Sequence, residues 1–312
     1  MPKFSIIITS YNGEKYVNNC LSSLKFQSFK DFETIFIDDG SDDKTETIVK
    51  KYKFISYYKI PHSGVSFARN YGIAKSQGDY FLFLDIDDYI APNLLEILNN
   101  FIKKNVDIVK YDYVSISDYS KNSKCEEYRT KRELTGLKAF ELLAQDKKPF
   151  DLICIYLYRK KFWLENKFEF SVDRFHEDFG IIPYIILKAS KVIVVDFPGY
   201  YYIQTENSIT RNDDYKKKLK KADDYLFHYD NLFKMVATDK NIPEYTKKIF
   251  NSYIANGVLA KSMTLKFKDR KKYLKELEKR NVSDYLLDDS IPRKVKKWFI
   301  KISPYFYYKI RG

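Results

Sequence analysis

Short apolar runs alternate with amphipathic stretches through the first hundred residues of this 312-residue chain. The apolar runs have the length and content of strands, whereas the stretches between them repeat apolar residues every three or four positions, as helices do. We expect strands at 4–9, 33–37, 54–60 and 80–84, and helices at 14–26, 44–52 and 65–76. This alternation is typical of a parallel sheet, in which right-handed crossovers bring every strand-to-helix loop to one edge. Ligand-binding residues are therefore expected at the carboxyl ends of these strands.

The rest of the chain predicts a mixed sheet followed by a helical region. We expect a helix at 92–104, a strand at 107–114, a polar stretch at 115–132, a helix at 134–144, and strands at 153–159 and 191–197. From residue 216 the pattern is mainly helical and rich in lysine. The predicted fold class is α/β, with a mostly parallel sheet flanked by helices in a domain at 1–215 and a basic helical region at 216–312.

Charge is distributed unevenly along the chain. The net charge is −1 up to Tyr215 and +14 from Lys216 onwards. Attraction to a polyanion or an anionic lipid surface would therefore come from the C-terminal region, residues 216–312.

The three cysteines are widely spaced, which predicts neither a disulfide framework nor a paired-cysteine metal site. No signal peptide begins the sequence and no apolar run reaches the ~18 residues that span a bilayer, so we expect a cytoplasmic protein.

An acidic cluster, Asp85, Asp87 and Asp88, ends the strand expected at 80–84. Neighbouring carboxylates repel one another unless a cation or a hydrogen-bond donor compensates them, and their oxygens suit Mg²⁺ or Mn²⁺ holding a phosphate. The alternative is a solvated acidic turn in which Asp88 or a neighbour caps the helix that begins near Pro92.

A second acidic loop, residues 38–43, follows the strand expected at 33–37. Gly40 permits a backbone turn that other residues resist, and a carboxylate here can accept a hydrogen bond from the imide N–H of a base. The alternative is an N-cap, supplied by Ser41 or Asp42, for the helix at 44–52.

Four ordered blocks carry a resemblance to a known family: residues 5–12 (SIIITSYN), 37–43 (IDDGSDD), 64–72 (GVSFARNYG) and 78–88 (GDYFLFLDIDD). In order and spacing they resemble the family 2 glycosyltransferases of GT-A fold. The resemblance is close over about residues 1–110 and looser to about residue 211. It implies a nucleotide-sugar half at about 1–110 and an acceptor half at about 111–215.

The resemblance also implies roles for residues of the donor site. Thr9 and Tyr11 would line the nucleotide pocket, with Tyr11 against the base, and Asp39 would accept the uracil imide proton. Arg69 would lie near the nucleotide, and Asp85 would face the ribose.

A metal site is implied as well, with Asp87 holding Mn²⁺ or Mg²⁺ on the diphosphate. A fixed cation is most valuable there, because the leaving nucleoside diphosphate gains negative charge as the sugar departs.

The general base is implied to lie in the segment Phe175 to Phe179. The family places an acidic pair at about this distance beyond the metal motif, which assigns the base to Asp178 and a positioning role to Glu177. The alternative is a helix start in which both acids complement the N-terminal dipole. His176 is a weaker candidate for a metal ligand, because a single His beside two acids is more often structural.

A last block, residues 200–211, resembles a family segment that closes over the diphosphate. Ser208, Thr210 and Arg211 are the candidate contacts, and a plain loop is the competing interpretation.

The segment 292–302 mixes cations with Trp298, Phe299 and Ile300. This composition suits a surface helix whose aromatic residues lie at the headgroup boundary of an anionic membrane. The alternatives are a helix packed on the catalytic domain with solvated lysines, and a site for an anionic glycopolymer.

Together these features predict an inverting, metal-assisted glycosyltransferase that transfers a hexosyl or N-acetylhexosaminyl group from a uridine-diphosphate sugar to a surface-glycan or lipid-linked acceptor. We expect it at the inner face of the cell membrane, with no nucleic acid partner. The alternative is a noncatalytic basic protein that binds membranes or polyanions. A sugar nucleotidylyltransferase is disfavoured, because the loop at 9–13 contains one glycine rather than a Gly-rich phosphate-binding run.

Overall fold

The computed structural model describes residues 1–102, 105–116, 127–146, 148–204 and 214–303. Contacts divide the chain into two compact units. The first unit comprises Met1–Ala139, Pro149–Asp173 and Ile185–Arg211, and the second comprises Phe140–Lys148, Arg174–Tyr184 and Asn212–Gly312. The second unit thus takes in two segments from within the domain expected at 1–215.

A nine-stranded mixed sheet forms the first unit, with the strand order β3-β2-β1-β4-β8-β6-β9-β5 and with β7 paired to β9. Its parallel half consists of β1 (Phe4–Ser10), β2 (Phe32–Asp38), β3 (Ile55–Lys59) and β4 (Tyr80–Asp85). The connecting helices are α1 (Val17–Lys25), α2 (Thr45–Val49) and α3 (Val65–Lys75). These elements confirm the expected α/β alternation, with boundaries within a few residues of those predicted.

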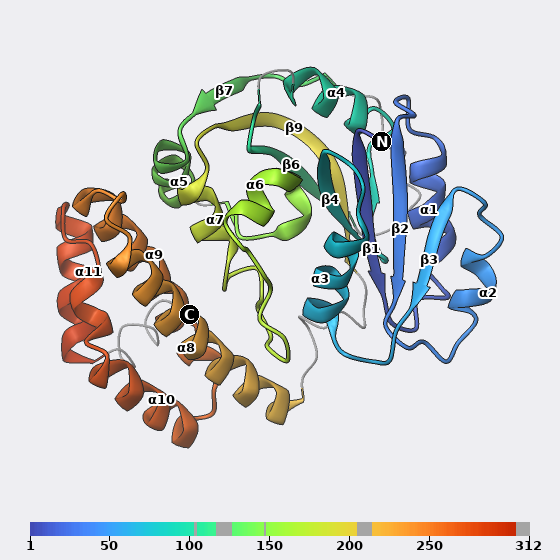
Figure 1. The fold of residues 1–312 in the computed structure, drawn as a ribbon. Coiled ribbons are helices and arrows are strands. Elements are labelled where there is room, and N and C mark those ends of the chain that lie inside the picture. The colour runs from blue at the N-terminus through green and yellow to red at the C-terminus, as the bar shows by residue number, and fades with distance from the viewer. Residues whose placement is uncertain (103–104, 117–126, 147, 205–213, 304–312) are drawn as a thin grey trace. The chain divides into compact units, whose positions relative to one another are not determined.

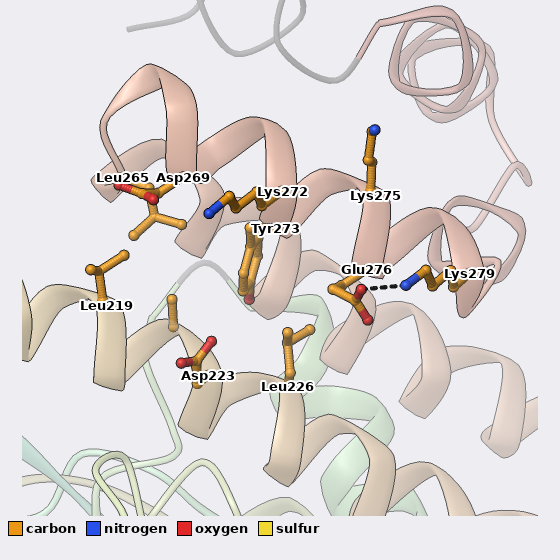
Figure 2. Close-up of a pocket in the computed structure, with 11 residues that line it drawn as sticks. Leu219, Asp223, Leu226, Leu265, Asp269, Lys272, Tyr273, Lys275, Glu276 and Lys279 are labelled. Atoms are coloured by element: carbon orange, nitrogen blue, oxygen red, sulfur yellow. Dashed lines mark hydrogen bonds and ion pairs between the residues drawn. The ribbon is translucent and has the colours of Figure 1, made fainter.

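Right-handed crossovers determine which face of the sheet each helix covers. The chain moves outward from β1 to β2 and β3 through α1 and α2, and then returns across the sheet to β4 through α3. As Figure 1 shows, α1 and α2 therefore lie on one side of these strands and α3 on the other. With both faces covered, β1 is an almost continuous apolar run in which Phe4, Ile6, Ile7 and Ile8 are fully buried.

The remaining strands extend the sheet past β4. They are β5 (Tyr89–Ile90), β6 (Ile108–Ile116), β7 (Lys131–Leu134), β8 (Tyr156–Arg159) and β9 (Val192–Ile203), with helices α4 (Leu94–Phe101) and α6 (Lys160–Glu165) between them. The strand expected at 153–159 begins one turn late, because Ile153–Ile155 form a 3₁₀ helix. The polar stretch expected at 115–132 contains the end of β6 and the start of β7.

The second unit is helical and contains α8 (Tyr215–Thr238), α9 (Glu244–Lys261), α10 (Phe267–Lys279) and α11 (Ile291–Ile302). Asp214 caps α8 by accepting a hydrogen bond from the backbone N–H of Lys216. The inserted segments join this unit through α5 (Gly136–Gln145) and the turn before α7 (Ile182–Lys188); Phe140, for example, packs on Phe250 of α9. None of the helices described is both long and apolar enough to cross a membrane.

Candidate active site

The sheet has a topological switch point between β1 and β4, the two central parallel strands from which the chain runs outward in opposite directions. Open α/β sheets bind ligands outside the carboxyl ends of the strands at such a point. Thr9 near the end of β1 pairs in register with Asp85 at the end of β4. Two residues expected in the donor site therefore lie side by side at this switch point.

The three acidic side chains of the turn after β4 differ in burial. Asp85 and Asp87 are partly exposed, whereas Asp88 is buried and accepts hydrogen bonds from the Tyr200 hydroxyl at 2.6 Å and the Ile203 N–H at 2.7 Å. Burial, together with the charges of Asp85 and Asp87, raises the pKa of Asp88 to about 9.

The alternative interpretation, in which Asp88 caps the following helix, is wrong. Helix α4 begins after Asn93 without a side-chain cap, and the Asp88 carboxylate bonds to β9 instead. Asp88 therefore anchors the acidic turn to the sheet, leaving Asp85 and Asp87 at the edge.

Arg69 on α3 holds Asp85. Its Nη2 donates to Asp85 Oδ1 at 3.1 Å, and its guanidinium lies 5.6 Å from the ring centre of Phe83 and 5.9 Å from that of Phe170. The Arg69 side chain is only 6% exposed, whereas that of Asp85 is 35% exposed. A guanidinium packed between rings has little freedom, so it determines the position of the more exposed carboxylate.

Asp39 is buried in the loop after β2 and binds the loop that follows β3. Its two carboxylate oxygens accept the Ser63 N–H at 2.7 Å and the Gly64 N–H at 2.9 Å, and His62 Nδ1 lies 3.0 Å from Oδ2. Gly40 permits this close approach: it has a φ of 80°, and a Cβ there would lie 2.8 Å from the His62 nitrogen. A carboxylate has about four acceptor positions, and the two backbone N–H groups of this loop occupy two of those of Asp39.

His62 is a residue that the sequence interpretation missed. Its imidazole packs against the Tyr11 ring, with centroids 4.2 Å apart, in addition to its contact with Asp39. Tyr11 is 50% exposed, so its ring retains open surface for a planar ligand. His62 follows β3, whose carboxyl end lies at the same edge as those of β1 and β2, and this topology was the available signal.

Hydrogen bonds join the loops after β1 and β2. Ser41 Oγ accepts the Asn12 N–H at 2.9 Å, Thr45 Oγ1 accepts the Gly13 N–H at 2.9 Å, and Asp43 Oδ2 accepts the Glu14 N–H at 3.0 Å. Neither Ser41 nor Asp42 caps α2, which begins after Lys44 without a side-chain cap. The polar side chains of the second loop and of the start of α2 therefore hold the first loop, and the alternative interpretation of an N-cap from Ser41 or Asp42 is wrong.

A divalent cation fits the carboxylates that remain at the edge. No group of three or more His, Cys, Asp or Glu side chains suited to a metal occurs among the residues described, so a cage made of protein ligands alone is not formed there. Mg²⁺ is commonly bound by one or two carboxylates plus substrate phosphates and water. Asp87, with Asp85 beside it, matches that smaller ligand set.

The acidic segment expected to supply the base lies in the second unit, where α8 holds it. Asp224, which is fully buried, accepts from Arg174 Nη1 at 2.8 Å and from the Phe175 N–H at 2.9 Å. His228 Nε2 lies 2.9 Å from the Phe175 carbonyl oxygen, and a Cβ on Gly180 would lie 2.2 Å from His228 Nδ1. Asp224 and His228 therefore hold this segment in place, which the sequence did not reveal.

His176 lies inside this segment in the left-handed conformation, with a φ of 60°. Its Nε2 is 3.1 Å from Lys261 Nζ, and its ring packs on Tyr225 with centroids 4.5 Å apart. Burial, and then the nearby charge of Lys261, lower the pKa of His176 to about 3. A neutral imidazole that accepts a hydrogen bond from an ammonium group is poorly placed to bind a cation, so His176 fits a structural role better than metal ligation.

Glu177 and Asp178 are half-buried in the turn that leads into α7. The Asp178 carbonyl accepts the backbone N–H groups of Ile181 at 3.1 Å and Ile182 at 2.8 Å. Both acids thus stand just before the helix N-terminus, where a negative charge is also favourable for the helix itself. The remaining candidates, Ser208, Thr210 and Arg211, lie outside the described residues.

Sequence comparisons identify relatives. The family model Glycosyl transferase family 2 matches residues 5–164. An uncharacterised glycosyltransferase of Haemophilus influenzae is 39% identical over 127 residues, covering 39% of this chain and 51% of the relative. The uncharacterised glycosyltransferase EpsJ of Bacillus subtilis is 30% identical over 218 residues, covering 67% of this chain and 63% of EpsJ. The matches thus span about half to two thirds of the length of these relatives.

Solved structures share the fold. Residues 1–349 of Staphylococcus aureus TarS, in complex with UDP-GlcNAc, superpose with a TM-score of 0.59 at 21% identity, covering 91% of this chain and 89% of that one. The mannosyltransferase PcManGT of Pyrobaculum calidifontis, in complex with GDP-Man and Mn²⁺, gives a TM-score of 0.58 at 14% identity, covering 94% and 78%. At these identities the similarity concerns the fold alone, and it confirms the expected GT-A fold.

Proposed function

The chain belongs to glycosyltransferase family 2, and on that premise we propose that it is an inverting enzyme that transfers a sugar from a uridine-diphosphate sugar to an acceptor hydroxyl. The observation that carries this proposal is the set of side chains at the switch point of the sheet. Thr9, Tyr11, Asp39, Asp85 and Asp87 all stand where strands β1, β2 and β4 end. Such an edge is the place where an α/β sheet binds a nucleotide.

Asp39 and Tyr11 carry the proposal that the base is uracil. The ring of Tyr11 offers an exposed face for stacking, and an acceptor position left on Asp39 suits the imide N–H of uracil. The complex of TarS with UDP-GlcNAc supports a uridine nucleotide. The sugar proposed to be transferred is an N-acetylhexosaminyl or hexosyl group. Arg69 acts on the ribose side, by holding Asp85.

Asp87 is the proposed ligand for Mn²⁺ or Mg²⁺, with Asp85 beside it. When bound, the cation neutralises charge on the departing diphosphate. PcManGT in complex with Mn²⁺ supports this choice of metal. Ser208, Thr210 and Arg211 are proposed as further contacts to the diphosphate.

Asp178 is the proposed general base, and Glu177 is proposed to position the acceptor or the base. The Asp178 carboxylate takes the proton of the acceptor hydroxyl as the oxygen forms its bond to the anomeric carbon, and the bond from that carbon to the diphosphate oxygen breaks. Because attack occurs opposite the leaving group, the anomeric configuration inverts. A positioned base contributes about 10²- to 10⁴-fold to the rate.

The proposed acceptor is a surface glycan or a lipid-linked precursor, and the proposed location is the inner face of the cell membrane. The name of one relative, the poly(ribitol-phosphate) beta-N-acetylglucosaminyltransferase TarS of Staphylococcus aureus, supports a polymeric acceptor.

Two measurements test the function. The first is a thermal-shift screen of UDP-sugars and GDP-mannose with and without Mn²⁺, in which a UDP-sugar should raise the melting temperature most. The second compares transfer by Asp178→Asn with that by Asp173→Asn, an exposed neighbour in a left-handed conformation that Asn also adopts. Asp178→Asn should bind the donor but lose transfer, whereas Asp173→Asn should keep both. Full turnover by Asp178→Asn would refute the base assignment.

A further inference from the structure

Helix α11 presents a narrow apolar stripe to solvent. Ile291, Val295, Trp298 and Ile302 are spaced at i, i+4, i+7 and i+11, which places them on one face of a helix. They are 78%, 47%, 58% and 62% exposed, respectively. Soluble helices ordinarily turn such a face toward the core. This helix instead buries Ile300, two residues after Trp298 and close to the opposite face.

The cations of α11 anchor it to the second unit. Arg293 pairs with Asp289 at 2.7 Å, Lys297 with Asp288 at 3.2 Å and Lys301 with Asp284 at 2.5 Å. Lys296 donates to the side chain of Asn256 on α9. Lys296 and the buried Ile300 lie on the face opposite the stripe, so the contact with α9 leaves the apolar stripe facing outward.

We propose that this stripe, Ile291, Val295, Trp298 and Ile302, is a membrane-docking surface that lies in the interface of an anionic lipid bilayer. This surface is separate from the transfer reaction and does not depend on it. The ends of the stripe are eleven positions apart, so it extends ~16 Å along the helix, which suits a helix lying in the membrane plane rather than crossing it. Isoleucine, valine and tryptophan are residues that enter the boundary between headgroups and acyl chains.

Charge selects lipid over a second copy of the chain as the occupant. Residues 216–312 carry a net charge of +14, so two copies docked through α11 would bring two strongly basic regions together. An anionic bilayer has the opposite sign, and Lys294 is exposed on the same helix to meet it. The long-range attraction thus brings the helix to the membrane, and the stripe supplies the short-range burial of apolar surface.

The test uses the full chain with vesicles made of equal parts phosphatidylglycerol and phosphatidylcholine. Wild type should float with these vesicles, and Trp298→Glu should bind about tenfold less, because a carboxylate in the stripe opposes insertion. Tyr245→Glu is the matched control: Tyr245 is an exposed aromatic residue of α9, 63% exposed, and the charge change is the same. This variant should bind as wild type does. Equal melting temperatures of the three proteins would show that the fold is intact.

Tryptophan fluorescence provides an independent readout. The chain has two tryptophans, and Trp163 is buried in the first unit at 1% exposure, so a blue shift on adding vesicles reports on Trp298. In Trp298→Phe the shift should vanish while flotation persists.

Four results would overturn the proposal. The first is unchanged flotation of Trp298→Glu, and the second is absence of both flotation and blue shift in wild type. The third is a wild-type dimer in sedimentation that Trp298→Glu converts to monomer without any vesicle binding, which would make the stripe a self-association surface. Binding of dextran sulfate without vesicle binding would assign the basic region to a soluble polyanion, and would also reject docking to lipid.

Discussion

Arg69 Nη2 donates to Asp85 Oδ1 at 3.1 Å from a guanidinium that is almost completely buried between Phe83 and Phe170. The pair joins α3 to the carboxyl end of β4. A residue buried in the body of the first unit thereby controls the orientation of a carboxylate at its edge.

We expect Arg69→Met to weaken UDP binding about tenfold while changing the free energy of unfolding by less than about 1 kcal/mol. Methionine keeps the contact with both rings, and Asp85 is exposed enough to be hydrated once its partner is gone. Arg69→Lys should not restore binding, because an ammonium group cannot reproduce the stacked planar donor. Calorimetric titration with UDP and urea unfolding measure the two quantities. Lys75→Met, on the exposed side of the same helix, is the control. Normal UDP affinity in Arg69→Met would contradict the role given to this pair.

Asp87→Asn should lower Mn²⁺-dependent transfer about a hundredfold or more, since it removes the carboxylate proposed to hold the cation. It should also remove the extra thermal stabilisation that Mn²⁺ gives in the presence of UDP, a readout that needs no acceptor. Asp79→Asn is a matched control, because Asp79 is an exposed acid that directly precedes the first residue of β4, at the end of the strand away from Asp87. If Mn²⁺ stabilises the Asp87→Asn complex with UDP as well as it stabilises wild type, Asp87 is not the ligand.

Variants of His62 separate its two contacts. His62→Asn keeps an N–H donor near Asp39 but loses the ring packed on Tyr11, whereas His62→Phe keeps the ring and loses the donor. Each should weaken UDP binding about threefold, and His62→Ala about tenfold, because a hydrogen bond and an aromatic contact each contribute about 0.5–1.5 kcal/mol. Titration with UDP measures the affinity of all three variants. Wild-type affinity in His62→Ala would show that neither contact contributes to binding of the uracil base.

The low pKa of His176 predicts acid sensitivity. The pKa is near 3 in the folded protein but near its ordinary 6.5 in the unfolded chain, so the unfolded chain binds more protons between these values. Stability from the neutral ring is therefore complete above about pH 6.5 and is lost as the pH falls toward 3. Between pH 7 and 5, wild type should lose about 1–2 kcal/mol more than His176→Asn, whose side chain tolerates the left-handed backbone.

His228, Lys261 and Lys221 remain in both proteins of that comparison, so the difference between them isolates His176. Urea unfolding at the two pH values measures the effect. Equal acid losses in the two proteins would mean that the ring is not protected in the folded state.

The parallel half of the sheet could be predicted from sequence because its information is local. Each strand or helix in the first hundred residues is specified by its own apolar spacing, and the order of elements then places Thr9, Asp39 and Asp85 at one edge. Donor-site candidates followed without any knowledge of side-chain contacts.

Contacts between distant segments were not predictable in this way. Thr246 Oγ1 donates to Glu141 Oε1 at 2.6 Å across 105 residues, and neither residue belongs to a recognisable motif. The attachment of Arg174 to Asp224, across 50 residues, is of the same kind. Periodicity identifies the face of a helix that will be buried but not the partner that will cover it, so it does not reveal that two segments from within residues 1–215 join the C-terminal helices.

The bonds between the loops after β1 and β2 have a consequence for affinity. Asn12, Gly13 and Glu14 donate backbone N–H groups to side chains of the second loop and of the first residue of α2, so this part of the edge is already ordered before any ligand binds. Little conformational entropy is then lost on docking a nucleotide, and the association rate should be set by encounter rather than by loop rearrangement. This part of the nucleotide site is therefore preformed rather than assembled by induced fit.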